Sequence, residues 1–159
     1  MKQRNFIFNI LIFSKNNYLQ MAVLLTWTLF TTISCKKDNS GIVPNVYVNI
    51  DVYLSDPSYV SLNAVGNAVY VVGGVKGIIL YRRAHDEFIA YERNCTYLPL
   101  NSCAKVTIDA SNTMMIDTCC GSKFNLVDGA VRNGPASRPL KEYQTTYNAT
   151  NAVVHIYNE

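Results

Sequence analysis

Hydrophobic and polar positions alternate from Val46 to Leu54, where every second residue is Val, Ile or Leu. A period of two is typical of a β-strand that buries one face and exposes the other. The polar cluster that follows, residues 55–58 (SDPS), has the composition of a turn. Residues 68–72 (AVYVV) then predict a second strand that is more fully apolar, and the Gly-Gly pair after it predicts another turn.

The same kind of pattern continues toward the end of the chain. Seven more short segments are predicted as strands, at residues 77–81, 88–91, 105–109, 114–117, 123–126, 143–147 and 153–157. Turn residues such as Asp128-Gly129 and Asn133-Gly134-Pro135 separate several of them. Many short strands at about ten-residue spacing predict an all-β fold, either a small β-sandwich or a barrel-like arrangement. Beyond residue 44 no stretch has a helical period.

Two short apolar runs precede these strands. Each is shorter than the ~20 apolar residues that a membrane-spanning helix needs. Positive charges at Lys2 and Arg4, an apolar core and the small Ser34 before a polar segment match the pattern of a signal peptide. We therefore expect residues 1–34 to be a signal segment of the lipoprotein type.

Cys35 directly follows Ser34, and this pair resembles the lipobox of bacterial lipoproteins, in which the Cys is lipidated and becomes the mature N-terminus. Thr32 stands where the lipobox usually has Leu. The resemblance implies a lipidated Cys35 with a polar tether over residues 35–44, in a cell-envelope protein held on the membrane at its periplasmic or surface side. An ordinary signal peptide with a chance Cys, or an uncleaved anchor, is the alternative. The folded domain is expected over residues 45–159.

The net charge of +3 comes from the signal segment. Lys2, Arg4 and Lys15 all precede Cys35, so in the rest of the chain 11 Lys and Arg (14 − 3) balance 11 Asp and Glu. A neutral domain has no electrostatic basis for binding nucleic acid, and we expect no nucleic-acid partner. A chain of 159 residues that is 49% hydrophobic is long enough for one domain with a single core.

Catalytic chemistry has no candidate residues in this sequence. His85 and His155 are the only histidines, and neither stands in a Ser/His/Asp arrangement. No pair of carboxylates stands out for acid–base work. Residues 72–77 (VGGVKG) do not form the G-x-G-x-x-G pattern and precede no helix, which favours a hairpin over a phosphate loop. We therefore expect no catalytic residue and no enzymatic activity.

Four cysteines follow the lipobox: Cys95, Cys103, Cys119 and Cys120. An even number in an exported domain predicts disulfides. A bridge between the adjacent Cys119 and Cys120 would be strained, so two pairings stay open, and both tie the 95–103 loop to the 119–120 turn. A metal site of thiolates is the alternative interpretation. Adjacent cysteines seldom both face one metal, however, because neighbouring side chains of an extended chain point in opposite directions.

Residues 90–97 (AYERNCTY) resemble the first cluster-binding loop of Rieske iron–sulfur proteins, where a Cys-x-His follows a strand. Residues 120–126 (CGSKFNL) resemble the second loop, which in the family reads Cys-Pro-x-His-Gly-Ser-x-Phe. The similarity covers about residues 68–157 and includes the Asp-Gly, Gly-Pro-Ala and Pro-Leu-x-x-Tyr segments between residues 128 and 143. The chain is also similar to Rieske-like lipoproteins of Bacteroidetes-type bacteria.

The resemblance implies a Rieske-like fold of stacked antiparallel sheets with the two loops side by side at one tip. It also implies a 2Fe–2S cluster, electron transfer and a redox or envelope protein as partner. The resemblance places Phe124 beneath the loops as a buried residue. It favours disulfides that join Cys103 to Cys119 and Cys95 to Cys120, because it places Cys95 and Cys120 facing the space of the cluster.

The departures from the family fall on the cluster ligands. A Rieske cluster takes two Cys on one iron and two His on the other. In register, Cys95 is the first Cys, but Tyr97, Asp117 and Cys120 occupy the other three positions. We therefore expect the standard 2Fe–2S cluster to be lost or altered.

Three arrangements of the cysteines then compete. The first is a thiolate-bound iron site in which Cys95 and Cys120 are ligands, completed by Cys103, Cys119 or Asp117. The second is a zinc site of three or four thiolates. The third is a cofactor-free domain, stapled by disulfides, that binds a partner at the cell envelope.

Overall fold

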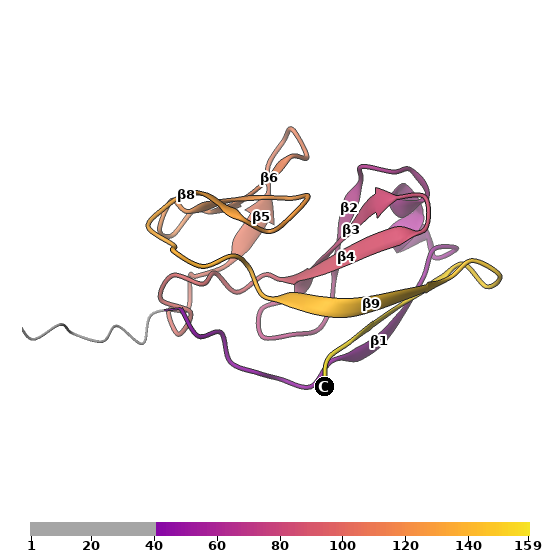
Figure 1. Ribbon diagram of the computed structural model, residues 1–159, viewed down its shortest axis with the longest axis horizontal. Helices are drawn as coiled ribbons and strands as arrows, with labels where there is room; N and C mark the ends of the chain where they lie inside the picture. Colours follow the sequence, from indigo (N-terminus) through magenta and orange to yellow (C-terminus); the bar gives the residue numbers. More distant parts are fainter. Residues whose placement is uncertain (1–40) are drawn as a thin grey trace, which may run out of the picture. The chain divides into compact units, whose positions relative to one another are not determined.

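Ten β-strands build the part of the chain that the computed structural model describes, residues 41–159 (Figure 1). Every neighbouring pair of strands is antiparallel, which confirms the all-β fold class. Among these residues no helix is both long enough and apolar enough to cross a membrane. The predicted signal segment, Cys35 and most of the tether lie outside the described residues.

The strands form a large and a small sheet. The large sheet has six strands in the order β1 (Asn49–Tyr53), β10 (Val153–Tyr157), β9 (Glu142–Asn148), β4 (Glu87–Glu92), β3 (Ile78–Ala84) and β2 (Ala68–Val71). The small sheet has four strands in the order β5 (Val106–Ile108), β6 (Met114–Asp117), β7 (Lys123–Asn125) and β8 (Val131–Asn133).

The small sheet is an insertion between two paired strands of the large sheet. The chain leaves the large sheet at the end of β4, builds β5 to β8, and returns at the start of β9. β4 and β9 pair through Ala90 with Tyr143 and Tyr91 with Glu142, so the exit and the return are neighbours. In Figure 1 the inserted strands lie together beyond one end of the large sheet, in salmon to orange. Both loops that carry cysteines belong to this insertion.

Successive side chains of β3 point into two different parts of the core. Ile78 and Leu80 belong to one buried cluster, together with Val52 of β1. Ile79 belongs to a second cluster, which fills the space between the two sheets and contains Phe124 of β7. Because neighbouring residues of a strand point to opposite faces, β3 is covered on both sides. This explains why the first four residues of β3, Ile78–Tyr81, are a continuous apolar run, whereas β1 alternates.

The predicted strands correspond to nine of the ten strands in the described part of the chain, and Phe124 is fully buried as predicted. Two elements were missed. A 3₁₀ helix covers Pro57–Asn63, where Asp56 caps the first turn by accepting a hydrogen bond of 2.7 Å from the Ser58 amide. The sequence pattern predicted only a turn over residues 55–58, which includes the first two residues of this helix. The three residues of β8 carry no alternation that a sequence pattern could detect.

Candidate functional site

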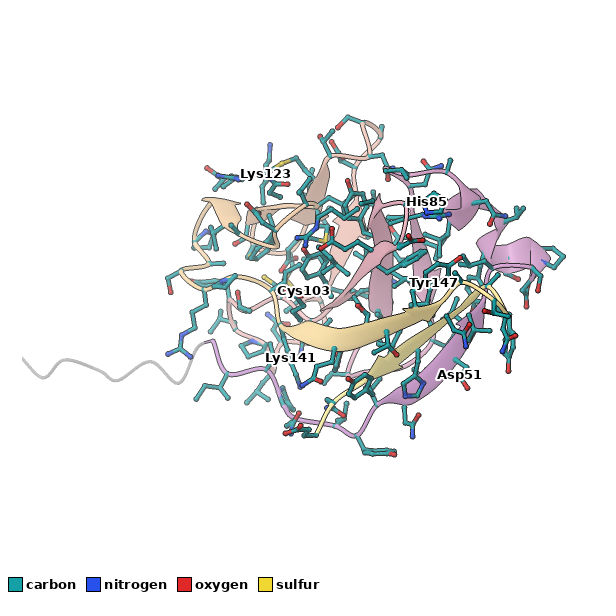
Figure 2. The ribbon with its side chains drawn as sticks, turned by 45° about the vertical axis from the view of Figure 1, so that its right-hand side comes forward. Asp51, His85, Cys103, Lys123, Lys141 and Tyr147 are labelled. Atoms are coloured by element: carbon teal, nitrogen blue, oxygen red, sulfur yellow. A yellow bond between two sulfur atoms is a disulfide. The ribbon has the colours of Figure 1, made fainter. Side chains whose placement is uncertain are left out.

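The two cysteine-bearing loops lie side by side at the inserted end of the domain. The first joins β4 to β5, the second joins β6 to β7, and a disulfide between Cys103 and Cys119 links them. In Figure 2, Cys103 and Lys123 mark this end of the domain, while Asp51 and Tyr147 lie toward the other end. The loops therefore form one tip, which is the architecture that the resemblance implied.

Cys95 and Cys120 are free thiols whose Sγ atoms lie 3.8 Å apart. The expected second disulfide is thus not formed, because an S–S bond needs about 2.05 Å. Asp117 completes a group of three: its carboxylate and the two sulfurs all lie within 4.8 Å of one another. Cys103 and Cys119 are bonded to each other and offer no thiolate, so three of the five candidate ligands are brought together.

The turn between β6 and β7 holds Asp117 and Cys120 in place. Asp117 is fully buried, and its Oδ1 accepts a 2.7 Å hydrogen bond from the Cys119 amide. The Cys120 thiol donates to Asp117 Oδ2 over 3.2 Å, and it also contacts Ser122 Oγ at 3.0 Å. Ser122 Oγ in turn accepts a hydrogen bond from the Ala136 amide. One carboxylate oxygen is therefore held by the backbone, while the other faces the sulfurs.

Cys95 enters the site from the end of β4. Its side chain is fully buried, and its amide donates to the Ala104 carbonyl over 3.2 Å. The Tyr97 amide points at its sulfur from 3.5 Å. Burial raises the pKa of the Cys95 thiol well above its ordinary value, and a hydrogen bond with Asp117 raises it further. In the absence of a cation, the thiol is therefore protonated at neutral pH.

A second buried carboxylate, Glu92, fixes the start of the first loop. It accepts hydrogen bonds from the amides of Val75 (2.6 Å), Lys76 (3.0 Å) and Asn94 (2.9 Å), and from the Tyr143 hydroxyl (2.7 Å). Four donors satisfy this carboxylate, so its role is structural. Glu92 could not be identified from the sequence, because three of its four donors, Val75, Lys76 and Tyr143, lie 17, 16 and 51 residues away and leave no local pattern.

The turn that precedes β3 also supports the first loop. Gly74 has φ +64°, and a Cβ at this position would overlap the Glu92 carboxylate. Beyond it, the Lys76 ammonium group donates to the carbonyls of Asn101 and Ala104. The Gly-Gly pair is thus part of a hairpin, as predicted. This hairpin supports the tip through the hydrogen bonds of Lys76 to the first loop.

A cavity of about 240 Å³ opens next to the three donors. Its walls are formed by Tyr97, Leu98, Asn101, Ala104, Asp117, Cys119, Cys120 and Pro135. The site therefore borders the cavity at Asp117 and Cys120, of which Cys120 is partly exposed, while Cys95 does not line it. Tyr97, at the first His position of the Rieske pattern, lines the cavity and is not one of the three donors that converge.

The donors do not fit a standard 2Fe–2S cluster. Such a cluster takes four protein ligands, two on each iron. Within residues 41–159 only three donors converge here, and one of them is a carboxylate. His85 pairs with Asp86, and His155 pairs with Asp51 on the large sheet, so neither reaches the tip.

No family model matches the chain, and no curated protein matches its sequence. Several solved structures are similar in fold. The plasma membrane Rieske protein of the cyanobacterium Synechocystis PCC 6803 is 21% identical over 72% of this chain and 100% of its own, with a TM-score of 0.48. One chain of the complex of oxygenase and ferredoxin in carbazole 1,9a-dioxygenase is 20% identical over 70% of this chain and 94% of its own, with a TM-score of 0.47.

A third similar structure is the putative NADH-dependent nitrite reductase small subunit of Mycobacterium tuberculosis. It is 14% identical over 72% of this chain and 98% of its own, with a TM-score of 0.41. Likenesses of this size concern the fold alone and say nothing of what this chain binds.

The expectation of no enzymatic activity is corrected by these structures. The dioxygenase complex and the nitrite reductase subunit are named as parts of enzymes. The earlier expectation rested on the absence of a triad or a carboxylate pair. A component of a redox enzyme needs neither, so that absence does not decide the question.

Proposed function

We propose that this chain is a lipid-anchored protein of the bacterial cell envelope, in which a Rieske-like tip carries an altered site in place of the standard 2Fe–2S cluster. One observation supports the altered site above all others. At the four positions where the Rieske pattern has ligands, the chain has Cys95, Tyr97, Asp117 and Cys120, and three of these converge within 4.8 Å. The anchor is proposed from the lipobox-like Ser34-Cys35 pair.

Iron and sulfide analysis tests this proposal. Full-length protein purified in detergent without air is expected to contain less than one iron per chain and no acid-labile sulfide. It is also expected to lack a reducible visible spectrum, because no imidazole pair is available for the outer iron. Two iron and two sulfide per chain would contradict the proposal and would make electron transfer through a 2Fe–2S cluster the function.

A second candidate is a stapled domain that binds an envelope protein without any cofactor. Leu98 and Leu100 favour it, because they are 47% and 88% exposed on the loop that the Cys103–Cys119 disulfide holds. Exposed apolar residues that lie close together can contribute to a patch for a partner protein. Replacing both leucines by Ser and measuring capture of envelope proteins against the unchanged chain separates this candidate from the first.

A further inference from the structure

We propose that Cys95, Asp117 and Cys120 form a mononuclear site for a divalent transition metal, Zn²⁺ in the first place, with a fourth position open to the tip cavity. The proposal rests on the proposed function, since a single ion requires the standard cluster to be absent. It assigns to the altered tip a specific ligand chemistry, two thiolates and one carboxylate.

The distances suit one tetrahedral ion. Zinc binds thiolate sulfur at about 2.3 Å, so two sulfurs on one tetrahedral ion lie about 3.8 Å apart. The Sγ atoms of Cys95 and Cys120 are separated by 3.8 Å. A carboxylate oxygen at about 2.0 Å from the same ion would lie about 3.5 Å from each sulfur. Asp117 Oδ2 is 3.2 Å from the Cys120 sulfur, so only a small shift is needed.

The orientation of Asp117 also fits a metal ligand. Its Oδ1 is held by the Cys119 amide, which leaves Oδ2 directed at the Cys120 sulfur. An outer hydrogen bond of this kind is how proteins orient a ligating carboxylate. Ser122 plays the same part for the sulfur of Cys120, since its hydroxyl lies 3.0 Å away and is itself fixed by the Ala136 amide.

Asp117 has fewer strong hydrogen-bond donors than the other buried carboxylate, Glu92. Glu92 accepts four hydrogen bonds from backbone amides and a hydroxyl. Asp117 has one backbone amide, and its other neighbours are thiols, which are weak donors. No ion pair found among residues 41–159 involves Asp117, and the ammonium group of Lys76 donates to loop carbonyls. Burying a carboxylate with so few donors is costly unless a cation pairs with it.

A disulfide between Cys95 and Cys120 fits the same surroundings less well. Closing it would bring the sulfurs from 3.8 Å to about 2.05 Å and would remove the thiol that donates to Asp117. The buried carboxylate would then keep the Cys119 amide as its main donor. A metal ion instead satisfies all three groups, and each thiol loses its proton to solvent as the ion binds.

The cavity supplies the route and the fourth ligand. Asp117, Cys120, Tyr97 and Pro135 line it, and Cys120 is partly exposed to solvent. Three protein ligands with an open fourth position are the arrangement in which zinc keeps a water molecule or binds a small donor ligand. The site is therefore one to which a small anion or thiol can be added, rather than a closed structural site.

Titration with Co²⁺ tests the proposal, because Co²⁺ bound by thiolates has absorption bands that Zn²⁺ lacks. Full-length protein, purified in detergent without air and freed of metal by a chelator, is expected to bind one Co²⁺ per chain with a sulfur-to-metal charge-transfer band. One equivalent of Zn²⁺ should remove the band. Cys120→Ser should weaken it, and Asp117→Asn should lower the affinity by at least about tenfold.

Asp86→Asn is the matched control. It makes the same change at an exposed carboxylate beside a histidine, and stoichiometry and affinity should stay as in the unchanged chain. Peptide mapping of the Cys103–Cys119 disulfide in each variant identifies proteins whose tip has folded. Equal losses in Asp86→Asn and Asp117→Asn would overturn the assignment.

The outcomes separate this inference from the proposed function. Co²⁺ binding without the charge-transfer band, or no binding, would overturn the metal site and leave the cluster-free tip in place. A Cys95–Cys120 disulfide in protein isolated without air would do the same. Two iron and two sulfide per chain would overturn both proposals.

Discussion

Phe124 shares a buried cluster with Cys95, and Met115 of β6 lies in the same cluster. Its side chain is fully buried, so Phe124→Ala removes a large apolar group and leaves a cavity. We expect the free energy of unfolding, measured in urea, to fall by about 3–5 kcal/mol. Val127→Ala, two residues beyond β7 at a side chain that is 44% exposed, is the control and should cost less than about 0.5 kcal/mol. Equal costs would contradict the observed register of β7.

The stability of the metal-free protein should fall in alkali. Burial raises the pKa of Cys95 above its ordinary 9.0 and the pKa values of Tyr91 and Tyr143 above their ordinary 10.0. Each group binds its proton more tightly in the folded chain than in the unfolded chain. Its contribution is therefore complete below the ordinary pKa and is lost as the pH rises above it. Denaturation from pH 7 to 10.5 should show a decline that begins near pH 9.

Tyr143→Phe tests the source of this decline. The variant loses the hydrogen bond to Glu92, so it should be less stable at pH 7 by about 1.5–3 kcal/mol. Its stability should then decline less steeply above pH 10, because one of the three titrating groups is gone. A free energy of unfolding that is constant from pH 8 to 10.5 in the unchanged chain would contradict the prediction.

The residues of the tip were predictable to different degrees. Cys95, Asp117 and Cys120 could be named in advance as candidate ligands. The alignment with the Rieske pattern marks the ligand positions along the chain, even where this chain has a different residue type. Glu92 could not be found, since its partners at Val75 and Tyr143 are 17 and 51 residues away. Hydrogen bonds of that kind depend on how the strands pair, and pairing is not visible in a local pattern.

The strands themselves were predictable because each carries a hydrophobic period or run. Exposed and buried residues alternate along β1, and the first half of β3 is apolar because both of its faces are covered. β8 was missed since it is a short strand at the edge of the small sheet with two of its three residues exposed. The insertion of one sheet into the other was likewise hidden, because it is decided by which strands pair rather than by where they begin.

Gly74→Ala and Gly66→Ala should lower the free energy of unfolding by different amounts. The difference should come from the contact of Gly74 with Glu92 in the hairpin before β3. Both glycines have positive φ, +64° at Gly74 and +90° at Gly66. Backbone strain alone favours an alanine at Gly74, whose φ is closer to the left-handed helical region. A Cβ at Gly74, however, overlaps Glu92, whereas nothing lies within 4 Å of a Cβ at Gly66.

We therefore expect Gly74→Ala to destabilise the protein more than Gly66→Ala, and the latter to cost about 1–2 kcal/mol. Thermal denaturation of the two variants measures the difference. The opposite order would mean that the Glu92 carboxylate is free to move away from the turn.

The disulfide between the two loops should contribute measurably to stability. Cys103 and Cys119 are 16 residues apart, and a bridge of that span stabilises by about 2–4 kcal/mol in the chain-entropy account. The double variant Cys103→Ser with Cys119→Ser should lose about this much in urea denaturation. Reduction of the unchanged chain with a thiol reagent should have a similar effect, because both residues are exposed. A loss below about 0.5 kcal/mol would show that other contacts already hold the loops together.

At the scale of the whole molecule, Cys35→Ser should release the protein from membranes. The expectation follows from the lipobox-like pair and from the hydrophobic energy of two acyl chains, which is enough for stable anchoring. Fractionation and mass spectrometry of the N-terminal peptide measure the result. Ser34→Ala keeps a small residue before Cys35 and should leave the protein lipidated. An unlipidated N-terminal peptide in the unchanged chain would refute the anchor.

Gly41, the first residue described, lies against the tip: a Cβ there would be 3.3 Å from the Thr96 carbonyl and 3.4 Å from the Arg138 side chain. In Figure 1 the described part of the chain begins, in indigo, at the end of the domain where the inserted strands lie. Six residues from Cys35 to Gly41 span at most about 20 Å when fully extended. If Cys35 carries the proposed lipid, Gly41 and the tip against which it lies would stay within about 20 Å of the anchored residue. Under that proposal a macromolecular partner would meet the site close to the membrane surface, whereas ions and small molecules could reach it from any side.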